Sequence, residues 1–198
     1  MIWHEVDQNS DEWLALRMGK FTASSISDLF MDKKTAGYQK AIIKVAYERV
    51  TGESEGWAGN YWTQRGHDRE PIARYSFENH TFLELEDAGF YELNEWFGAS
   101  PDAKIKGANA GVEIKCPSAQ IYNEYLDTGK IPKSYYWQIH AQLFCTGWDY
   151  IYYFPYSSPN LRQILIKVDR DEEVISAIKE KLITSIEEVQ ILIKKITL

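Results

Sequence analysis

Two acidic residues and a lysine are spaced as in a metal-dependent hydrolytic site. Asp102 follows a small-residue run and a proline, and Glu113-Ile114-Lys115 comes after a further gap. Alternate residues of a strand share a face, so Glu113 and Lys115 should project together, and a hairpin return would bring Asp102 beside Glu113. Two converging carboxylates repel each other unless they share a proton or a cation. Hard oxygen ligands without a nearby histidine or thiolate favour Mg²⁺ or Mn²⁺ over Zn²⁺.

Such a site would suit phosphodiester hydrolysis. A bound metal polarises the phosphate and lowers the pKa of a water ligand, and Lys115 would hold that water and offset charge in the transition state. The ordinary alternative is that Glu113 and Lys115 form a solvated surface pair, as most Glu-x-Lys pairs on strands do. The Pro101-Asp102 pair upstream favours the catalytic interpretation, but the residues alone leave both open.

The overall composition is that of an ordinary globular protein. The formal net charge of −7 argues against a protein that coats nucleic acid by charge alone, although it permits one local basic strip. The N-terminus does not resemble a signal peptide, and no apolar run approaches the roughly 18 residues of a membrane span. The chain has 2 cysteines, too few for a disulfide framework. We therefore expect an intracellular protein without a membrane anchor.

The predicted elements are those of a single α/β domain over residues 1–198. Helical spacing of apolar residues predicts helices over 11–18, 22–30, 38–50, 61–77, 119–127, 135–146 and 172–196. Alternating or β-branched segments predict strands over 82–93 (broken at 87–89), 96–100, 111–116, 150–156 and 163–168, with a Gly-rich loop over 103–110. This order predicts a helical N-terminal part of about 1–80, a sheet core of about 81–170 and a C-terminal helix of about 171–196. A central mixed β-sheet flanked by helices on both faces would accommodate it.

Five motifs follow one another along the chain: Trp13-x-x-x-Arg17-x-Gly19-x-x-Thr22-Ala23-Ser24, Arg65-Gly66-x-x-x-Glu70-x-x-Ala73, Gly98-Ala99-Ser100-Pro101-Asp102, Val112-Glu113-Ile114-Lys115-Cys116-Pro117 and Tyr135-Tyr136-Trp137-Gln138-Ile139-His140-Ala141-Gln142. This ordered set resembles the phage lambda exonuclease and YqaJ-type viral recombinase family of the PD-(D/E)xK nuclease superfamily. The resemblance implies a restriction-endonuclease-like core. It also implies a metal-dependent 5′-to-3′ exonuclease on double-stranded DNA, which releases 5′-mononucleotides and leaves 3′ single-stranded tails for recombination. A structure-specific or restriction-like endonuclease of the same superfamily is the alternative.

The resemblance assigns roles in a catalytic centre with two Mg²⁺ ions, for which Mn²⁺ would substitute. The metal ligands would be the side chains of Asp102 and Glu113 and the backbone carbonyl of Ile114. Lys115 would position the attacking water, Glu70 would lie near the second metal or the nucleophile, and Gln138 would orient the lysine or the scissile phosphate. From the residues alone, Glu70 could equally face solvent. Gln138 and Gln142, one turn apart, could equally form an ordinary polar helix face.

The resemblance also implies a pocket for the 5′-terminal phosphate, formed by Arg17, Thr22, Ser24 and Ser100. Guanidinium groups and hydroxyls at a helix start are suitable phosphate ligands. Without the family pattern, Arg17 could be a surface ion pair and Ser24 only a helix cap.

Other implied features concern DNA and partner proteins. The strand-separating apolar wedge of lambda-type enzymes aligns with Thr63, so the neighbouring Trp62 is the candidate for that role. Ala103 departs from the family pattern, in which a glycine commonly follows the motif aspartate. The family likeness further implies binding to double-stranded DNA ends, a homotrimeric ring and a single-strand annealing partner. The corresponding location is the cytoplasm of a bacterial host, with the protein encoded by a phage or prophage.

Overall fold

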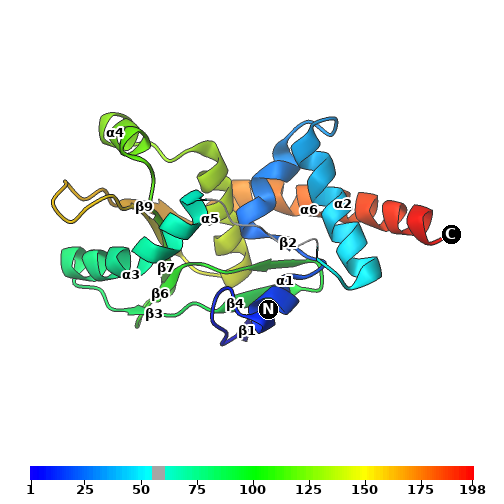
Figure 1. Ribbon diagram of the computed structural model, residues 1–198, viewed down its shortest axis with the longest axis horizontal. Helices are drawn as coiled ribbons and strands as arrows, with labels where there is room; N and C mark the ends of the chain where they lie inside the picture. Colours follow the sequence, from blue (N-terminus) through cyan, green and yellow to red (C-terminus); the bar gives the residue numbers. More distant parts are fainter. Residues whose placement is uncertain (55–60) are drawn as a thin grey trace.

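The computed structural model describes residues 1–54 and 61–198, except that the side chains of residues 61–67 lie outside the described part. Two mixed β-sheets form its framework (Figure 1). The four-stranded sheet has the order β1-β4-β5-β2, with bounds Ile2–His4, Phe90–Asn94, Phe97–Ala99 and Phe21–Thr22. The five-stranded sheet has the order β3-β6-β7-β8-β9, with bounds Leu85–Glu86, Ala103–Ile105, Ala110–Lys115, Tyr150–Pro155 and Ile166–Asp169.

Seven helices fall within the described residues: α1 Asp11–Arg17, the 3₁₀ helix η1 Ala23–Phe30, α2 Ala36–Thr51, α3 Tyr61–Thr81, α4 Ala119–Thr128, α5 Lys133–Thr146 and α6 Glu172–Thr197. Polar caps begin several of them: Ser10 accepts a bond from Trp13 N at the start of α1, and Asp171 accepts two at the start of α6. These bonds satisfy backbone N–H groups that the first turn leaves unpaired. No described helix meets the length and hydropathy that crossing a bilayer requires.

Helices cover both faces of the five-stranded sheet. On one face, Val112 and Ile114 of β7 join a cluster with Ala73 and Phe77 of α3. On the other face, Ile151 of β8 belongs to the larger core that includes much of α5. Successive residues of a strand point to opposite faces, so Glu113 faces α5 while its two neighbours face α3. The expected mixed α/β fold with helices on both faces of a sheet is therefore confirmed.

Several elements differ from those expected. The strands divide into two sheets, and the segments on either side of the expected break at 87–89 belong to different ones: β3 pairs with β6, and β4 with β1 and β5. The predicted loop over 103–110 begins with strand β6, and the short strands β1 and β2 were missed. The second predicted helix is a 3₁₀ helix. Short strands that pair with distant segments have too few residues to show an alternating pattern.

Candidate active site

Strand β6 places Asp102 against β7. The β6–β7 pair is antiparallel, with Ala103 opposite Val112, so Asp102, which precedes β6, lies beside the Glu113–Lys115 segment. Its Oδ2 atom accepts a hydrogen bond from Ile114 N at 2.6 Å. The expected hairpin return is present, although β6 forms it rather than β5. Glu113 and Lys115 share a face of β7, and the lysine ammonium group donates to Glu113 Oε1.

The Glu113 carboxylate is enclosed between β7 and α5. Its side chain is 0% exposed, and α5 supplies two donors one turn apart. Gln138 Nε2 donates to Oε1 at 2.6 Å, and Gln142 Nε2 donates to Oε2 at 2.7 Å. A buried carboxylate is costly unless it is paired and hydrogen-bonded, so these bonds hold both oxygens in fixed positions. The ordinary alternative, a solvated Glu–Lys surface pair, is excluded by this burial.

Electrostatics at the centre favour a cation. Burial and the negative charges of Glu113 and Glu70 raise the pKa of Asp102 well above its ordinary value, against a lowering effect of Lys115. Burial opposes the charged form of Lys115, but the attraction of Glu113 and Asp102 outweighs it and raises the pKa of the ammonium group. The lysine Nζ atom also lies 5.3 Å from the centroid of the Tyr135 ring. The carboxylates therefore repel one another at a place where positive charge is stabilised.

The donor set fits Mg²⁺ or Mn²⁺. Asp102 and Glu113 contribute hard oxygens, and the raised pKa of Asp102 marks a position where a cation would relieve repulsion. Among the side chains of residues 1–54 and 68–198, however, no group of three or more His, Cys, Asp or Glu is arranged to hold an ion. Glu113 and Asp102 would thus bind metal together with backbone and water oxygens.

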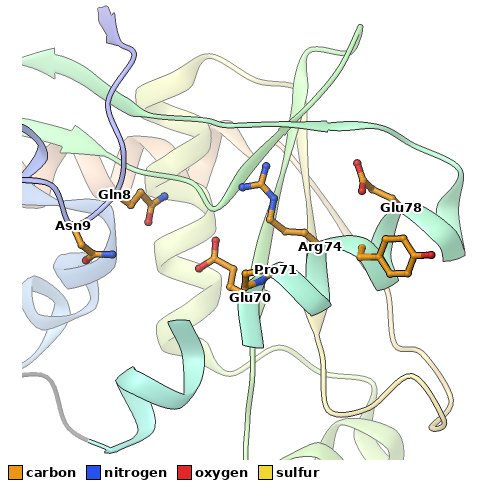
Figure 2. Close-up of a pocket in the computed structure, with 7 residues that line it drawn as sticks. Gln8, Asn9, Glu70, Pro71, Arg74 and Glu78 are labelled. Carbon is orange, nitrogen blue, oxygen red and sulfur yellow. The ribbon is translucent and has the colours of Figure 1, made fainter. Parts of the chain in front are cut away.

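Glu70 lines an open cavity of about 480 Å³. The cavity is lined by residues of the N-terminal loop and α3: Gln8, Asn9, Glu70, Pro71, Arg74, Tyr75 and Glu78 (Figure 2). Gln8 Nε2 donates to the Pro101 carbonyl at 3.0 Å, which ties the cavity wall to the residue before Asp102. Glu70 acts electrostatically on Asp102, so the cavity adjoins the catalytic centre.

The four residues expected to bind phosphate gather beside α1. The Arg17 guanidinium makes long contacts with Thr22 Oγ1 at 3.5 Å and Ser24 Oγ at 3.4 Å. It also lies over the Trp13 ring, 4.0 Å from the centroid. Trp13 Nε1 donates to Ser100 Oγ at 2.6 Å. Burial lowers the pKa of Arg17 to about 10, although the attraction of Glu48 opposes this, and at neutral pH the group stays charged. We call Arg17, Thr22, Ser24 and Ser100 the hydroxyl–arginine cluster.

Comparisons with known proteins identify the family of the chain. The family model of the YqaJ-like viral recombinase domain matches residues 12–149. The chain belongs to this family. Among solved structures, it resembles the alkaline exonuclease LHK-Exo from Laribacter hongkongensis, with 29% identity, a TM-score of 0.85 and coverage of 95% of this chain and 96% of that one. LHK-Exo in complex with dAMP gives 29% identity, a TM-score of 0.86 and coverage of 94% and 96%.

A phage related exonuclease from Haemophilus somnus 129PT shares the fold, with 18% identity, a TM-score of 0.68 and coverage of 89% and 96%. No curated protein matches the sequence. The family match and the LHK-Exo likeness confirm the resemblance found in the sequence and identify the chain as a nuclease of the phage recombinase type.

Two residues of this recombinase-family site were not assigned from the sequence. Gln142 binds Glu113 as closely as Gln138 does, and its position one turn after Gln138 was the available signal. Trp13 contacts both Arg17 and Ser100, and its bond to Ser100 spans 87 positions of sequence, which no local pattern reveals. The candidate strand-separating residue, Trp62, has its side chain outside the described part of the chain.

Proposed function

We propose that the whole chain is one nuclease domain that degrades double-stranded DNA from its ends in the 5′-to-3′ direction with Mg²⁺. The supporting observation is that the hydroxyl–arginine cluster and the hydrolytic centre share one short segment. Ser100 belongs to the cluster, and Asp102, two residues later, contacts β7. A terminal phosphate held at the cluster would place a phosphodiester of the same strand near Lys115. That arrangement favours removal of one nucleotide at a time.

The proposed roles follow from the contacts. Asp102, Glu113 and the Ile114 carbonyl would hold the ion, and Glu70 would complete the acidic side of the centre. The ion, when bound, supplies Lewis-acid polarisation of the phosphate and a water of lowered pKa. Gln138 and Gln142 keep the Glu113 carboxylate fixed. Lys115 holds the attacking water and offsets the charge that develops on the phosphate oxygens.

The remaining functional features rest on the family and on the relatives. LHK-Exo has been solved with dAMP, a mononucleotide, which supports release of 5′-mononucleotides here. Family likeness supports 3′-tailed products for recombination, two ions per site, a homotrimeric ring and a single-strand annealing partner. It also supports action in the cytoplasm of a bacterial cell that carries a phage or prophage. Trp62 is proposed to help separate the strands.

End-labelled duplexes test the proposal. Linear DNA carrying a 5′-terminal or a 3′-terminal label is digested with Mg²⁺ or with EDTA, beside covalently closed circular DNA. We expect early release of the 5′ label as a mononucleotide, late release of the 3′ label, no cleavage of circles and no activity in EDTA. The variant Lys115→Ala controls for contaminating nuclease. Cleavage of circles would identify an endonuclease, and early release of the 3′ label would reverse the proposed polarity.

A further inference from the structure

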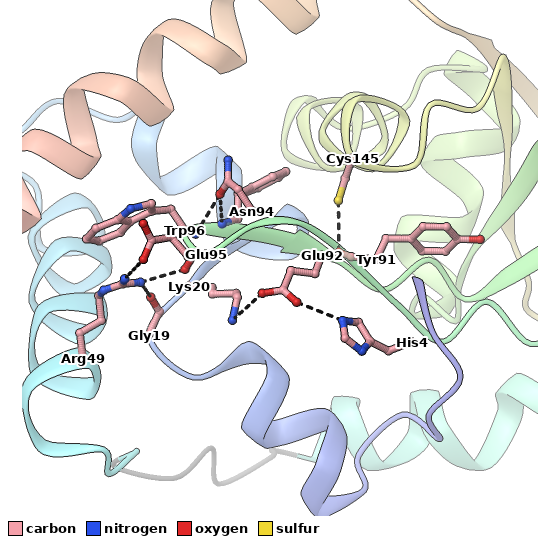
Figure 3. Close-up of polar contacts among 11 residues, drawn as sticks. His4, Gly19, Lys20, Arg49, Tyr91, Glu92, Asn94, Glu95, Trp96 and Cys145 are labelled. Atoms are coloured by element: carbon pink, nitrogen blue, oxygen red, sulfur yellow. Dashed lines mark hydrogen bonds and ion pairs between the residues drawn. The ribbon is translucent and has the colours of Figure 1, made fainter. Parts of the chain in front are cut away.

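The turn that follows Arg17 is held by two consecutive residues of α2. Gly19 N donates to Glu48 Oε2 at 2.9 Å, and the Gly19 carbonyl accepts from Arg49 Nη1 at 2.9 Å. Gly19 has a φ of 67°, and a Cβ atom added there would lie 2.7 Å from Arg49 Cγ. Both polar groups of this glycine are therefore bound, and its conformation leaves no room for a side chain. Figure 3 shows Arg49 reaching the turn from α2.

Glu48, which binds Gly19 N, is a buried carboxylate. Its side chain is 5% exposed. Ser54 Oγ donates to Glu48 Oε1 at 2.8 Å, and Lys44 Nζ lies 3.8 Å from the same atom. Its negative charge also acts on Arg17. Burying a charged side chain costs free energy unless hydrogen bonds or opposite charges stabilise it. For Glu48, one of these stabilising partners is the backbone N–H of Gly19, in the turn that directly follows Arg17.

Arg49 connects this turn to the four-stranded sheet. Its guanidinium donates to the Glu95 carbonyl at 2.8 Å and to Glu95 Oε2 at 2.9 Å, and it lies 3.5 Å from the centroid of the Trp96 ring (Figure 3). The backbone of Phe21, just after the turn, donates to the Trp96 carbonyl at 2.9 Å. The turn connects α1 to the Thr22–Ser24 segment, and hydrogen bonds hold it both to α2 and to the four-stranded sheet.

We infer that Glu48 is a positioning residue for recognition of the 5′-phosphate: with Arg49 it fixes the Gly19 turn so that Arg17 meets the hydroxyls of Thr22 and Ser24. The inference rests on the phosphate pocket proposed above. Glu48 would not contact DNA. Its effect would be confined to substrates that carry the phosphate, because only they use the oriented guanidinium.

The test measures kcat/KM on duplexes with 5′-phosphate and with 5′-hydroxyl ends. Glu48→Ala removes the acceptor of Gly19 N and should lower the phosphate preference by roughly 10- to 100-fold, as misplacement of an orienting group does. Activity on 5′-hydroxyl ends should stay within about twofold of wild type. Glu48→Gln keeps an acceptor oxygen and should restore most of the preference. Glu188 of α6, whose carboxylate pairs with Lys33, provides the control: Glu188→Ala also removes a paired carboxylate and should leave the phosphate preference unchanged.

Two outcomes would overturn the inference: a wild-type preference in Glu48→Ala, or an equal loss on both kinds of end. If Glu48→Ala does not fold, Arg49→Met decides, because methionine has no group that can donate to the Gly19 and Glu95 carbonyls, which Arg49 Nη1 binds together; a wild-type preference in that variant would refute the inference. Arg17→Ala separates the two proposals. If it abolishes the preference while Glu48→Ala does not, the pocket stands and the role of Glu48 is wrong. If Arg17→Ala changes nothing, the pocket and the inference both fail.

Discussion

Replacing Gln142 with methionine tests whether α5 holds the catalytic carboxylate in place. Methionine is similar in size to glutamine, adapts to its surroundings and donates no hydrogen bond. Gln142 Nε2 donates to Oε2 of Glu113 at 2.7 Å, and Glu113 is 0% exposed. A hydrogen bond to a charged buried group contributes about 1.5–3 kcal/mol. We expect the metal-free protein to lose part of that amount in free energy of unfolding.

The loss of stability in Gln142→Met alone underestimates the free energy of the hydrogen bond, because Gln142 also has a destabilising feature. Its Oε1 atom is buried and has no hydrogen-bond partner among the described residues. Methionine removes that unpaired oxygen along with the donor, which offsets part of the loss. A double-mutant cycle with Glu113→Met cancels such independent costs. The coupling free energy between the two positions should therefore be about 1.5–3 kcal/mol.

Urea denaturation in EDTA gives the four free energies of the cycle, and Gln190→Met, an exposed position on α6, is the matched control. If the fixed carboxylate is needed in the transition state, the same energy lowers kcat/KM of Gln142→Met by roughly 10- to 150-fold. A coupling below about 0.5 kcal/mol, together with wild-type kcat/KM, would show that Gln142 does not orient Glu113.

Three further variants address the catalytic centre and its framework. Lys115→Ala should reduce cleavage to background in a gel assay while DNA binding in EDTA persists, because the ammonium group acts on the water and the transition state; retained turnover would contradict its role. Asp102→Asn should abolish Mg²⁺ activation. Burial and the repulsion of Glu113 raise the pKa of Asp102 in the folded protein, so stability falls as the pH rises above the ordinary carboxyl pKa, and the loss is complete above the raised pKa. The metal-free Asn variant lacks this loss and should melt at the same or a higher temperature at alkaline pH; a lower melting temperature would contradict this sign. Gly111→Ala should lower the free energy of unfolding by roughly 1–3 kcal/mol or more, because the added Cβ atom would lie 2.0 Å from Trp148 Cζ3. A wild-type melting temperature in this variant would contradict the close packing of Trp148 on Gly111.

Local patterns predicted the catalytic strand well. The alternation in 111–116 indicated which side chains share a face, and the structure places Val112 and Ile114 in the core below α3. The helix predicted over 135–146 is also present, and in the structure it begins two residues earlier, at Lys133. Strand β6 was missed because it has only three residues, Ala103–Ile105, and Lys106 and Gly107 follow it directly. Strand β1 pairs with β4, about 90 residues away, and a pairing of that sequence separation leaves no local trace.

Side-chain contacts between distant segments escaped prediction for the same reason. The sequence indicated that Glu113 and Lys115 project together, but not that α5 covers them or that Glu113 is fully buried. Likewise, Arg17 and Ser100 were associated only by family likeness, and the Trp13 ring that joins them became evident in the structure. The periodicity of apolar residues shows which side chains share one face of a helix or strand. It does not show which other element packs against that face, because that depends on the tertiary fold.

The choice of glutamines on α5 has an electrostatic consequence. A buried carboxylate could also be satisfied by a second lysine or an arginine, but that would cancel part of the negative charge of the centre. Neutral amides donate to both oxygens of Glu113 and leave its charge in place. With Asp102, Glu113 and Glu70 ionised and Lys115 protonated, these four residues carry a net charge of −2, which the first divalent cation to bind would neutralise. The amides thus fix the geometry of the carboxylate without competing for the charge that an ion would use.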